Sequence, residues 1–273
     1  MDLIMAKLIM RLAKKRNCNM AVLTEKQIKY GFDYYHKDEK QLKSVVEVSE
    51  YDGEDKLMIN CTQLDEDYSA KDKKRILQEW CSFLVEHPDT FTELMFCTRM
   101  PQELFDAVCT QRRLKRLHIK WGVYPDISRL ENLQELEYLH IGSGRSVSSL
   151  EPISRLVNLV ALSIENFQQI DDYAPLANLK HLESLALEGD FAAPKILKVQ
   201  SLEFLRHMKQ LRFFSFLMAK VIDKDYSPIL ELNNLEHLTL KSCKEVKQLY
   251  PQFVKLPKLK YGTVLERPEL YEK

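Results

Sequence analysis

Two histidines and a nearby thiol come closest to a metal site in this 273-residue chain. His118 and His140 are 22 residues apart and occupy equivalent positions in a repeated pattern described below, so we expect them on neighbouring strands about 5 Å apart. Met95 and Cys97 are expected on the adjacent strand. A structural zinc site normally needs four ligands, and the pattern places no further residue of a suitable type. The sequence therefore predicts no metal site.

Ser163 is expected beside His140, as a nucleophile lies beside its base in hydrolases. The pattern positions no carboxylate to orient the imidazole, and an open sheet excludes little water. The chain has no H-E-x-x-H, G-x-S-x-G or kinase signature. Its seven glycines form neither a complete G-x-G-x-x-G motif nor a P-loop. We therefore predict no catalytic residue and no cofactor.

The charge balance bears on the class of partner. Forty Lys and Arg residues face forty Asp and Glu residues, which gives a formal net charge of zero. Such a balance argues against a protein whose main task is to neutralise nucleic-acid phosphates or an anionic membrane. With 45% hydrophobic and 29% charged residues, the chain is expected to fold.

The cysteines and the N-terminus bear on the compartment. Six cysteines are scattered along the chain without a C-x-x-C pair, which favours reduced thiols and a cytoplasmic location. Lys7 and Arg11 interrupt the apolar start, so we expect no signal peptide, and no apolar run is long enough to span a membrane. As a helix, this start would be basic along one face. It would either cover an end of the fold or associate weakly with a membrane surface or partner.

An apolar-x-x-apolar-x-apolar pattern recurs eight times and decides the fold. The copies begin at Phe91, Leu114, Leu136, Leu159, Leu182, Leu211, Leu235 and Leu259, at intervals of 22 to 29 residues. Most are preceded by apolar residues at every third position, as in Ile127-Leu130-Leu133. That period fits a short helical segment, and the spacing 1-4-6 fits a short strand with alternate residues pointing inward.

Over about residues 89 to 265 the sequence resembles the leucine-rich repeat family, in the class of roughly 22-residue repeats found in internalins and in a eukaryotic phosphatase regulatory subunit. The segments 150–153 and 170–179 carry the closest match. The resemblance implies an α/β solenoid with a parallel concave sheet, and a protein partner. The family's turn asparagine is replaced by Gly122, Gly144, Phe167, Asp190 and Cys243.

Stacked repeats need caps at both ends. We expect residues 1–88 to form an α+β N-terminal cap and residues 89–273 a leucine-rich repeat domain of about eight repeats. The cap would contain the basic helix, an antiparallel meander and a helix over about 70–86 that begins at Ser69. The meander would include a strand through Ile28 and Phe32 and a hairpin of segments 42–51 and 57–64. At the other end, the weak eighth repeat would close the column, and about six extra residues near 190–197 would form a loop.

If positions 1, 4 and 6 of each strand are buried, positions 2, 3, 5 and 7 are free to form the concave face. The predicted partner-binding residues on this face are Arg116, His118, Lys120, Tyr138, His140, Glu165, Glu188, Phe213, Leu217, His237 and Tyr261. Charged zones beside exposed aromatic side chains suit a protein or peptide partner. For the Lys and Glu members, ordinary solvated strand residues are the favoured interpretation, whereas for Phe213, Tyr261 and Leu217 we favour binding, because exposed apolar side chains on one face are less expected by chance.

The leading hypothesis is a non-catalytic scaffold that binds a macromolecule across the concave face. Two alternatives remain open from the sequence. The N-terminal segment could carry an enzymatic or regulatory activity that the repeats target, or the protein could neutralise a toxin or effector.

Overall fold

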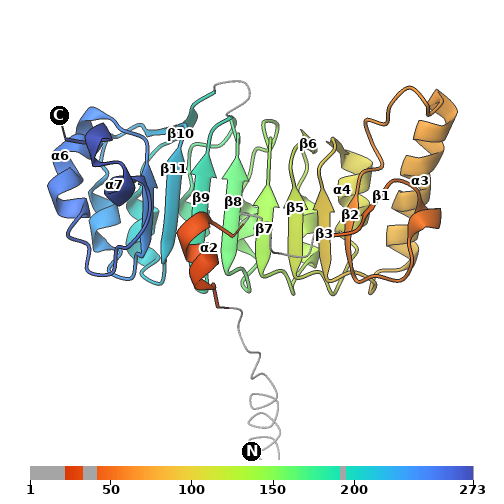
Figure 1. The fold of residues 1–273 in the computed structure, drawn as a ribbon, viewed down its shortest axis with the longest axis horizontal. Coiled ribbons are helices and arrows are strands. Elements are labelled where there is room, and N and C mark those ends of the chain that lie inside the picture. The colour runs from red at the N-terminus through yellow and green to blue at the C-terminus, as the bar shows by residue number, and fades with distance from the viewer. Residues whose placement is uncertain (1–21, 33–41, 191–194, 273) are drawn as a thin grey trace, which may run out of the picture.

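The fold is built around one parallel sheet, and the computed structural model describes residues 22–32, 42–190 and 195–272 (Figure 1). The described strands form a nine-stranded sheet in the order β1-β2-β3-β5-β7-β8-β9-β11-β13. Their bounds are β1 Ser44–Val45, β2 Lys56–Ile59, β3 Glu93–Phe96, β5 Arg116–Ile119, β7 Tyr138–Ile141, β8 Ala161–Glu165, β9 Ser184–Glu188, β11 Phe213–Leu217 and β13 His237–Leu240. The register places equivalent repeat residues side by side, so that Leu117 pairs with Leu139 and Leu139 with Leu162.

Short helical segments connect the strands, as the period of three predicts. They are α4 Gln102–Val108, η2 Ser128–Asn132, α5 Glu151–Ser154, η3 Ala174–Asn178, η4 Glu203–His207 and η5 Ser227–Glu231. Two small parallel pairs lie outside the main sheet, β4 Met100–Pro101 with β6 Gly122–Val123 and β10 Leu197–Val199 with β12 Ala219–Val221. Of the extra residues near 190–197, residues 191–194 lie outside the described part of the chain; Asp190 and Lys195 form an antiparallel bridge, and β10 begins at Leu197.

The core is a continuous column of repeat residues. Leu117, Leu139, Leu162 and Leu185 are all fully buried, as are the residues two positions after them. The prediction that positions 1, 4 and 6 face inward is therefore confirmed for the strands. Since no single repeat can bury its own leucines, this stacking supplies the stability of the whole unit.

The N-terminal end is closed by helix α3, Ala70–Glu86, which begins after Ser69 as predicted. Its Trp80 side chain is fully buried and donates a hydrogen bond of 2.8 Å to the carbonyl of Val46. The predicted antiparallel hairpin is wrong, because β1 and β2 pair in parallel and extend the main sheet. The loop between them is long enough to include the 3₁₀ turn η1, Val48–Glu50, and so returns the chain in the same direction. The boundary at residue 88 stays a prediction; the sheet itself runs across it.

The C-terminal end is closed by helices α6 Lys244–Phe253 and α7 Thr263–Glu266 and the turn η6 Pro268–Leu270. The eighth pattern copy does not form a strand. It makes a single bridge, between Tyr261 and His237, and then enters α7. Gly262 stands where a buried strand residue is expected, and its φ of 98° directs the chain away from the sheet.

Before the cap, helix α2, Glu25–Tyr30, lies on the face of the sheet toward the viewer in Figure 1. The predicted strand over this segment is wrong. The side chain of Thr24 accepts a hydrogen bond from the Gln27 amide and Gln27 reaches back to the Thr24 amide, a capping box that starts a helix. Gly31, with a φ of 87°, ends it. The predicted basic helix lies outside the described residues.

Candidate functional site on the concave face

The concave face is hollowed near its middle by small side chains. At position 3 of successive strands stand Tyr138, Ala161, Ser184 and Phe213, which pair directly in the register. Two small residues therefore lie between two aromatic rings. Position 5 is also small here, at Ser163, Ala186 and Ser215. We call the hollow over Ala161 and Ser184, between Tyr138 and Phe213, the trough.

The trough is filled by residues 22–32 of the same chain, which we call the α2 segment. Leu23, Ile28 and Phe32 are 3%, 1% and 4% exposed and form one buried cluster with Val160 and Ala161. Tyr138 and Tyr261 pack against this cluster from either side. The α2 segment thus makes the apolar contacts that a bound peptide would make on this surface.

Main-chain groups of the α2 segment are held by charged side chains of the sheet. Arg116 donates a hydrogen bond of 2.7 Å to the carbonyl of Phe32 at one end. At the other end, Arg212 donates to the carbonyl of Leu23 over 3.4 Å, and the Leu23 amide donates to Glu183 over 3.4 Å. These contacts recognise backbone atoms, so they hold a segment without selecting its side chains.

A row of ion pairs orders the residues that hold Leu23. Arg212 lies between Glu183, at 3.0 Å, and Glu236, at 2.7 Å. Lys260 extends the row with a contact of 2.9 Å to Glu236. Although burial opposes the effect, hydrogen bonds from Lys260 and Arg212 lower the pKa of Glu236. The row therefore keeps the Glu236 carboxylate charged and fixes Arg212 for its contact with the α2 segment.

His237, on β13, lies beside the backbone of Ile28 and Lys29 in the docked α2 segment. Its ring packs 4.2 Å from that of Phe213 and one ring nitrogen lies 2.8 Å from the Thr239 hydroxyl. Burial lowers the pKa of His237 to about 4, while Glu266 and the carbonyls of Ile28 and Lys29 act in the opposite direction. The imidazole is therefore neutral at physiological pH.

The residues considered for chemistry do come together. The rings of His118 and His140 stack at 4.3 Å, and Nδ1 of His140 lies 3.0 Å from the Ser163 hydroxyl. Ser163 is only 6% exposed, and burial raises the pKa of the Cys97 thiol. Within the described residues no group of three or more His, Cys, Asp or Glu side chains could hold a metal ion.

The other predicted site residues divide into two groups. Arg116, Tyr138 and Tyr261 contact the α2 segment. Phe213 and His237 were expected to be exposed, but they are 6% and 8% exposed, which corrects the prediction. The α2 segment is one physical cause, because the Gly31 backbone and the carbonyls of Ile28 and Lys29 lie against these rings.

The remaining predicted residues, Lys120, Glu165, Glu188 and Leu217, stand at position 7, at the ends of the strands. Lys120 is exposed and the other three are half-buried. Burial raises the pKa of Glu165, and Glu188 accepts a hydrogen bond of 2.8 Å from the Ser215 hydroxyl. Their role in binding a partner stays a prediction.

Sequence reasoning placed position 2 on the concave face, but it did not predict the docked α2 segment or select the position-2 residues that contact it, Val160, Glu183 and Arg212. Glu236 and Lys260, also at position 2, order Arg212 through ion pairs. A signal for the helix was present, since Thr24 and Gln27 have the spacing of a capping box. Alternating charge at position 2 also marked the row of ion pairs. Nothing local to residues 22–32 indicated that they dock on strands 84 or more positions away in the chain.

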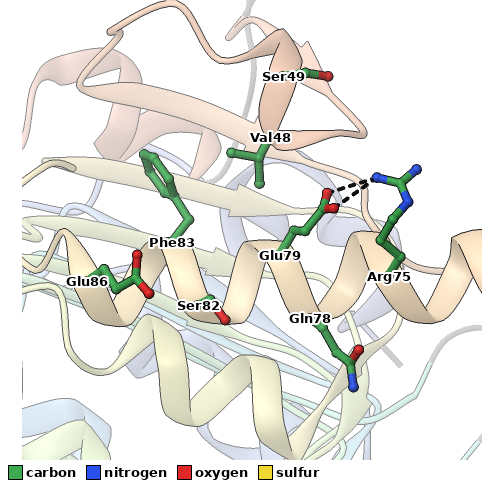
Figure 2. A pocket seen from close by; sticks show the side chains of 8 residues that line it. All are labelled: Val48, Ser49, Arg75, Gln78, Glu79, Ser82, Phe83 and Glu86. Atoms are coloured by element: carbon green, nitrogen blue, oxygen red, sulfur yellow. Dashed lines mark hydrogen bonds and ion pairs between the residues drawn. The ribbon is translucent and has the colours of Figure 1, made fainter.

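A second hollow lies at the N-terminal cap, beside α3 and η1 (Figure 2). Arg75 is its basic group, and it already pairs with Glu79 at 2.9 Å and with Glu47 at 3.2 Å. Apart from Val48 and Phe83, the rest of the lining is polar or acidic. With its guanidinium satisfied by two carboxylates, this hollow offers weaker recognition than the trough.

The spacing of the repeats and the in-register parallel sheet define a leucine-rich repeat solenoid. No protein-family model and no curated protein matches the sequence. Among the described helices, none is long and apolar enough to cross a membrane.

Solved structures with a similar course of the chain include two internalins of Listeria monocytogenes. Internalin InlF is 18% identical, with a TM-score of 0.47 over 63% of this chain and 54% of its own. Internalin C2 is 16% identical, with a TM-score of 0.36 over 67% of this chain and 83% of its own. A leucine-rich repeat protein of Leptospira interrogans is 16% identical, with a TM-score of 0.34 over 63% and 53%. This chain thus spans about half the length of two of these three proteins.

Proposed function

We propose that this protein is a non-catalytic, cytoplasmic scaffold that binds a protein partner across the concave face of its solenoid. The observation that carries the proposal is the occupied trough. It binds a short segment through buried apolar side chains, paired arginines and an aromatic rim. Such aromatic and arginine anchors dominate protein interfaces.

A protein partner suits the charges of this surface better than a nucleic acid does. The chain has no net charge, and the basic residues Arg212 and Lys260 are matched by Glu183 and Glu236. A surface neutralised in this way releases few counterions from a phosphate backbone. Its polar contacts are instead placed for amide and carbonyl groups of a polypeptide.

The proposal of a non-catalytic role is supported by the state of the nucleophiles. Ser163 is too deeply buried for a substrate carbonyl to reach its oxygen. Burial raises the pKa of Cys61 to about 12 and that of Cys81 to about 11, so these thiols are protonated and unreactive. The five cysteines in the described part of the chain are unpaired, which fits a reducing compartment.

The test is capture of a binding partner from the native lysate, followed by measurement with the purified partner. A concave variant, Arg116→Glu with Tyr138→Ala, is compared with a control variant, Arg155→Glu with Tyr250→Ala, whose residues lie at α5 and on α6. The proposal predicts loss of the partner with the concave variant and retention with the control. The reverse pattern, or equal binding by both, would overturn it.

A further inference from the structure

The α2 segment is not part of the solenoid core. Its buried residues Leu23, Ile28 and Phe32 form a cluster of their own with Val160 and Ala161, apart from the main core. The leucine column beneath is complete without them, since Leu162 and Leu185 are fully buried on the opposite side of the strands. Undocking the α2 segment would therefore uncover one surface cluster and leave the fold closed.

The α2 segment also has the physical character of a ligand that becomes ordered when it binds. Helix α2 has six residues, too few for a stable helix in isolation. Its outward residues, including Lys26, Lys29 and Tyr30, are exposed. The helix consequently depends on the trough for its structure, whereas the trough belongs to a rigid sheet.

The fit of the α2 segment leaves one polar group of the trough without a partner. The hydroxyl of Ser184 is buried in the floor and has no hydrogen-bond partner among the described residues. A buried hydroxyl without a partner costs free energy. A competing segment that presents a donor or acceptor at this point would gain a contact that the α2 segment lacks.

We propose that the α2 segment is an exchangeable internal ligand, and that the partner binds the same trough through a short segment of the same chemistry. That segment would carry apolar side chains at positions i, i+5 and i+9, as Leu23, Ile28 and Phe32 do. An acidic side chain at i+2, matching Glu25, would meet the Tyr261 hydroxyl. This inference rests on the proposed function and specifies which part of the concave face the partner occupies.

The polar and apolar contacts of the trough play different parts, and this predicts which peptides it would bind. Arg116 and Arg212 bind carbonyl oxygens that every peptide offers. Selection among peptides therefore depends on the apolar side chains of the peptide. The small residues Ala161 and Ser184 leave space for those side chains only between the flanking rings of Tyr138 and Phe213. A peptide with a charge at the Ile28 position would have to bury it against Val160 and Ala161, which is strongly unfavourable.

The experiment uses a fluorescein-labelled peptide of residues 22–32 (VLTEKQIKYGF) as the probe and the full chain as receptor. Ile28→Asp in the chain is expected to undock its own α2 segment and so free the trough. The control variant is Val157→Asp, at a side chain that is 50% exposed. Both variants are first required to show the wild-type thermal transition of the solenoid.

We expect the Ile28→Asp chain to bind the peptide at least about tenfold more tightly than the wild-type or Val157→Asp chain, because a tethered segment competes at up to millimolar effective concentration. Adding Ala161→Arg to Ile28→Asp should abolish binding, and a peptide carrying Ile28→Asp should not bind. Equal binding by all chains, or none to Ile28→Asp up to about 0.5 mM peptide, would overturn the exchange.

A second arm separates this inference from the proposed function. Unlabelled peptide is added to the complex of the Ile28→Asp chain with the captured partner, and displacement of the partner supports a shared trough. A partner that stays bound, yet is lost with the concave variant, would overturn the inference and leave the proposed function standing. Peptide binding to the trough without any partner that depends on the concave residues would overturn the proposed function and, with it, the shared trough, and would leave only the exchangeable docking of the α2 segment standing.

Discussion

The hydroxyl of Tyr261 donates a hydrogen bond of 2.9 Å to the carboxylate of Glu25, which joins residues 236 positions apart in the chain. The contact ties the first described helix to the last, incomplete repeat. Lys29 also lies 5.7 Å from the centre of the Tyr261 ring, as in a cation–π contact. The C-terminal rim of the sheet therefore helps to hold the N-terminal segment in the trough.

Removing the hydroxyl of Tyr261 tests this tie. Tyr261→Phe keeps the ring but loses the hydrogen bond to Glu25. Undocking of α2 should then be about fivefold more frequent, and trypsin should cut after Lys26 and Lys29 correspondingly faster, since cleavage follows the open population. Mass spectrometry of the early fragments measures the rate. Tyr250→Phe on α6 is the matched control, and equal rates for both variants would contradict the tie.

The ionisation of His237 predicts a dependence on pH. The folded state binds this proton less readily than the unfolded state, because burial lowers the pKa of His237 to about 4 from 6.5. The contribution of neutral His237 to the free energy of unfolding is therefore complete above about pH 6.5. It is lost as the pH falls toward 4, which lowers the free energy of unfolding by up to about 3 kcal/mol. NMR titration of the imidazole protons measures the pKa directly. Ile28→Asp should move the pKa of His237 back toward 6.5, whereas a pKa that is the same in both chains would show that the α2 segment does not bury the ring.

Close packing at Gly144 predicts a coupled pair of substitutions. A Cβ atom at Gly144 would lie 1.8 Å from the Phe167 ring, so Gly144→Ala should destabilise the fold by about 1–3 kcal/mol. The cost should be smaller in a Phe167→Leu background, where the ring is absent. Urea unfolding of the four chains gives the coupling free energy. Ser148→Ala, at an exposed site nearby, is the control, and strictly additive effects would contradict the contact.

The N-terminal cap predicts a large effect at Trp80. This side chain is fully buried and its indole nitrogen is satisfied by the Val46 carbonyl. Trp80→Ala should cost about 3–5 kcal/mol through the cavity and the unpaired carbonyl. Val85→Ala on the same helix, at a side chain that is 55% exposed, should change the free energy of unfolding by less than about 0.5 kcal/mol. Similar urea midpoints for the two variants would show that α3 does not close the core.

The sequence alone predicts the solenoid because its information is local and repeated. Leu117, Leu139 and Leu162 recur at a constant interval, and each buries the next, so one pattern determines the fold and the register. Helix α3 is predictable for the same reason, from the Ser69 cap and the apolar face that includes Trp80. The failures lie where the pattern stops. Where the pattern expects a buried strand residue, Gly262 instead turns the chain into helix α7. Near β1, the alternation of apolar and polar residues predicts a strand but not whether neighbouring strands run parallel or antiparallel.

The site was predictable only as a face of the sheet. The repeat places Arg116, Tyr138 and Phe213 on one surface, and that is confirmed by the register. Whether such residues are exposed depends on a segment whose docking site is distant in sequence. Leu23 and its contact Arg212 are separated by 189 positions, and no local periodicity encodes such a pairing.

The most direct test of the central claim, that the concave face is a binding surface occupied by the chain's own α2 segment, is hydrogen–deuterium exchange of residues 22–32 in the full chain. The amides of Ile28 and Gly31 donate hydrogen bonds of 3.0 and 2.9 Å within α2. We predict that both are protected in the wild-type chain and exchange at least about tenfold faster in Ile28→Asp, because a six-residue helix is unstable once undocked. Exchange of these amides at the unfolded rate in the wild-type chain would contradict the account.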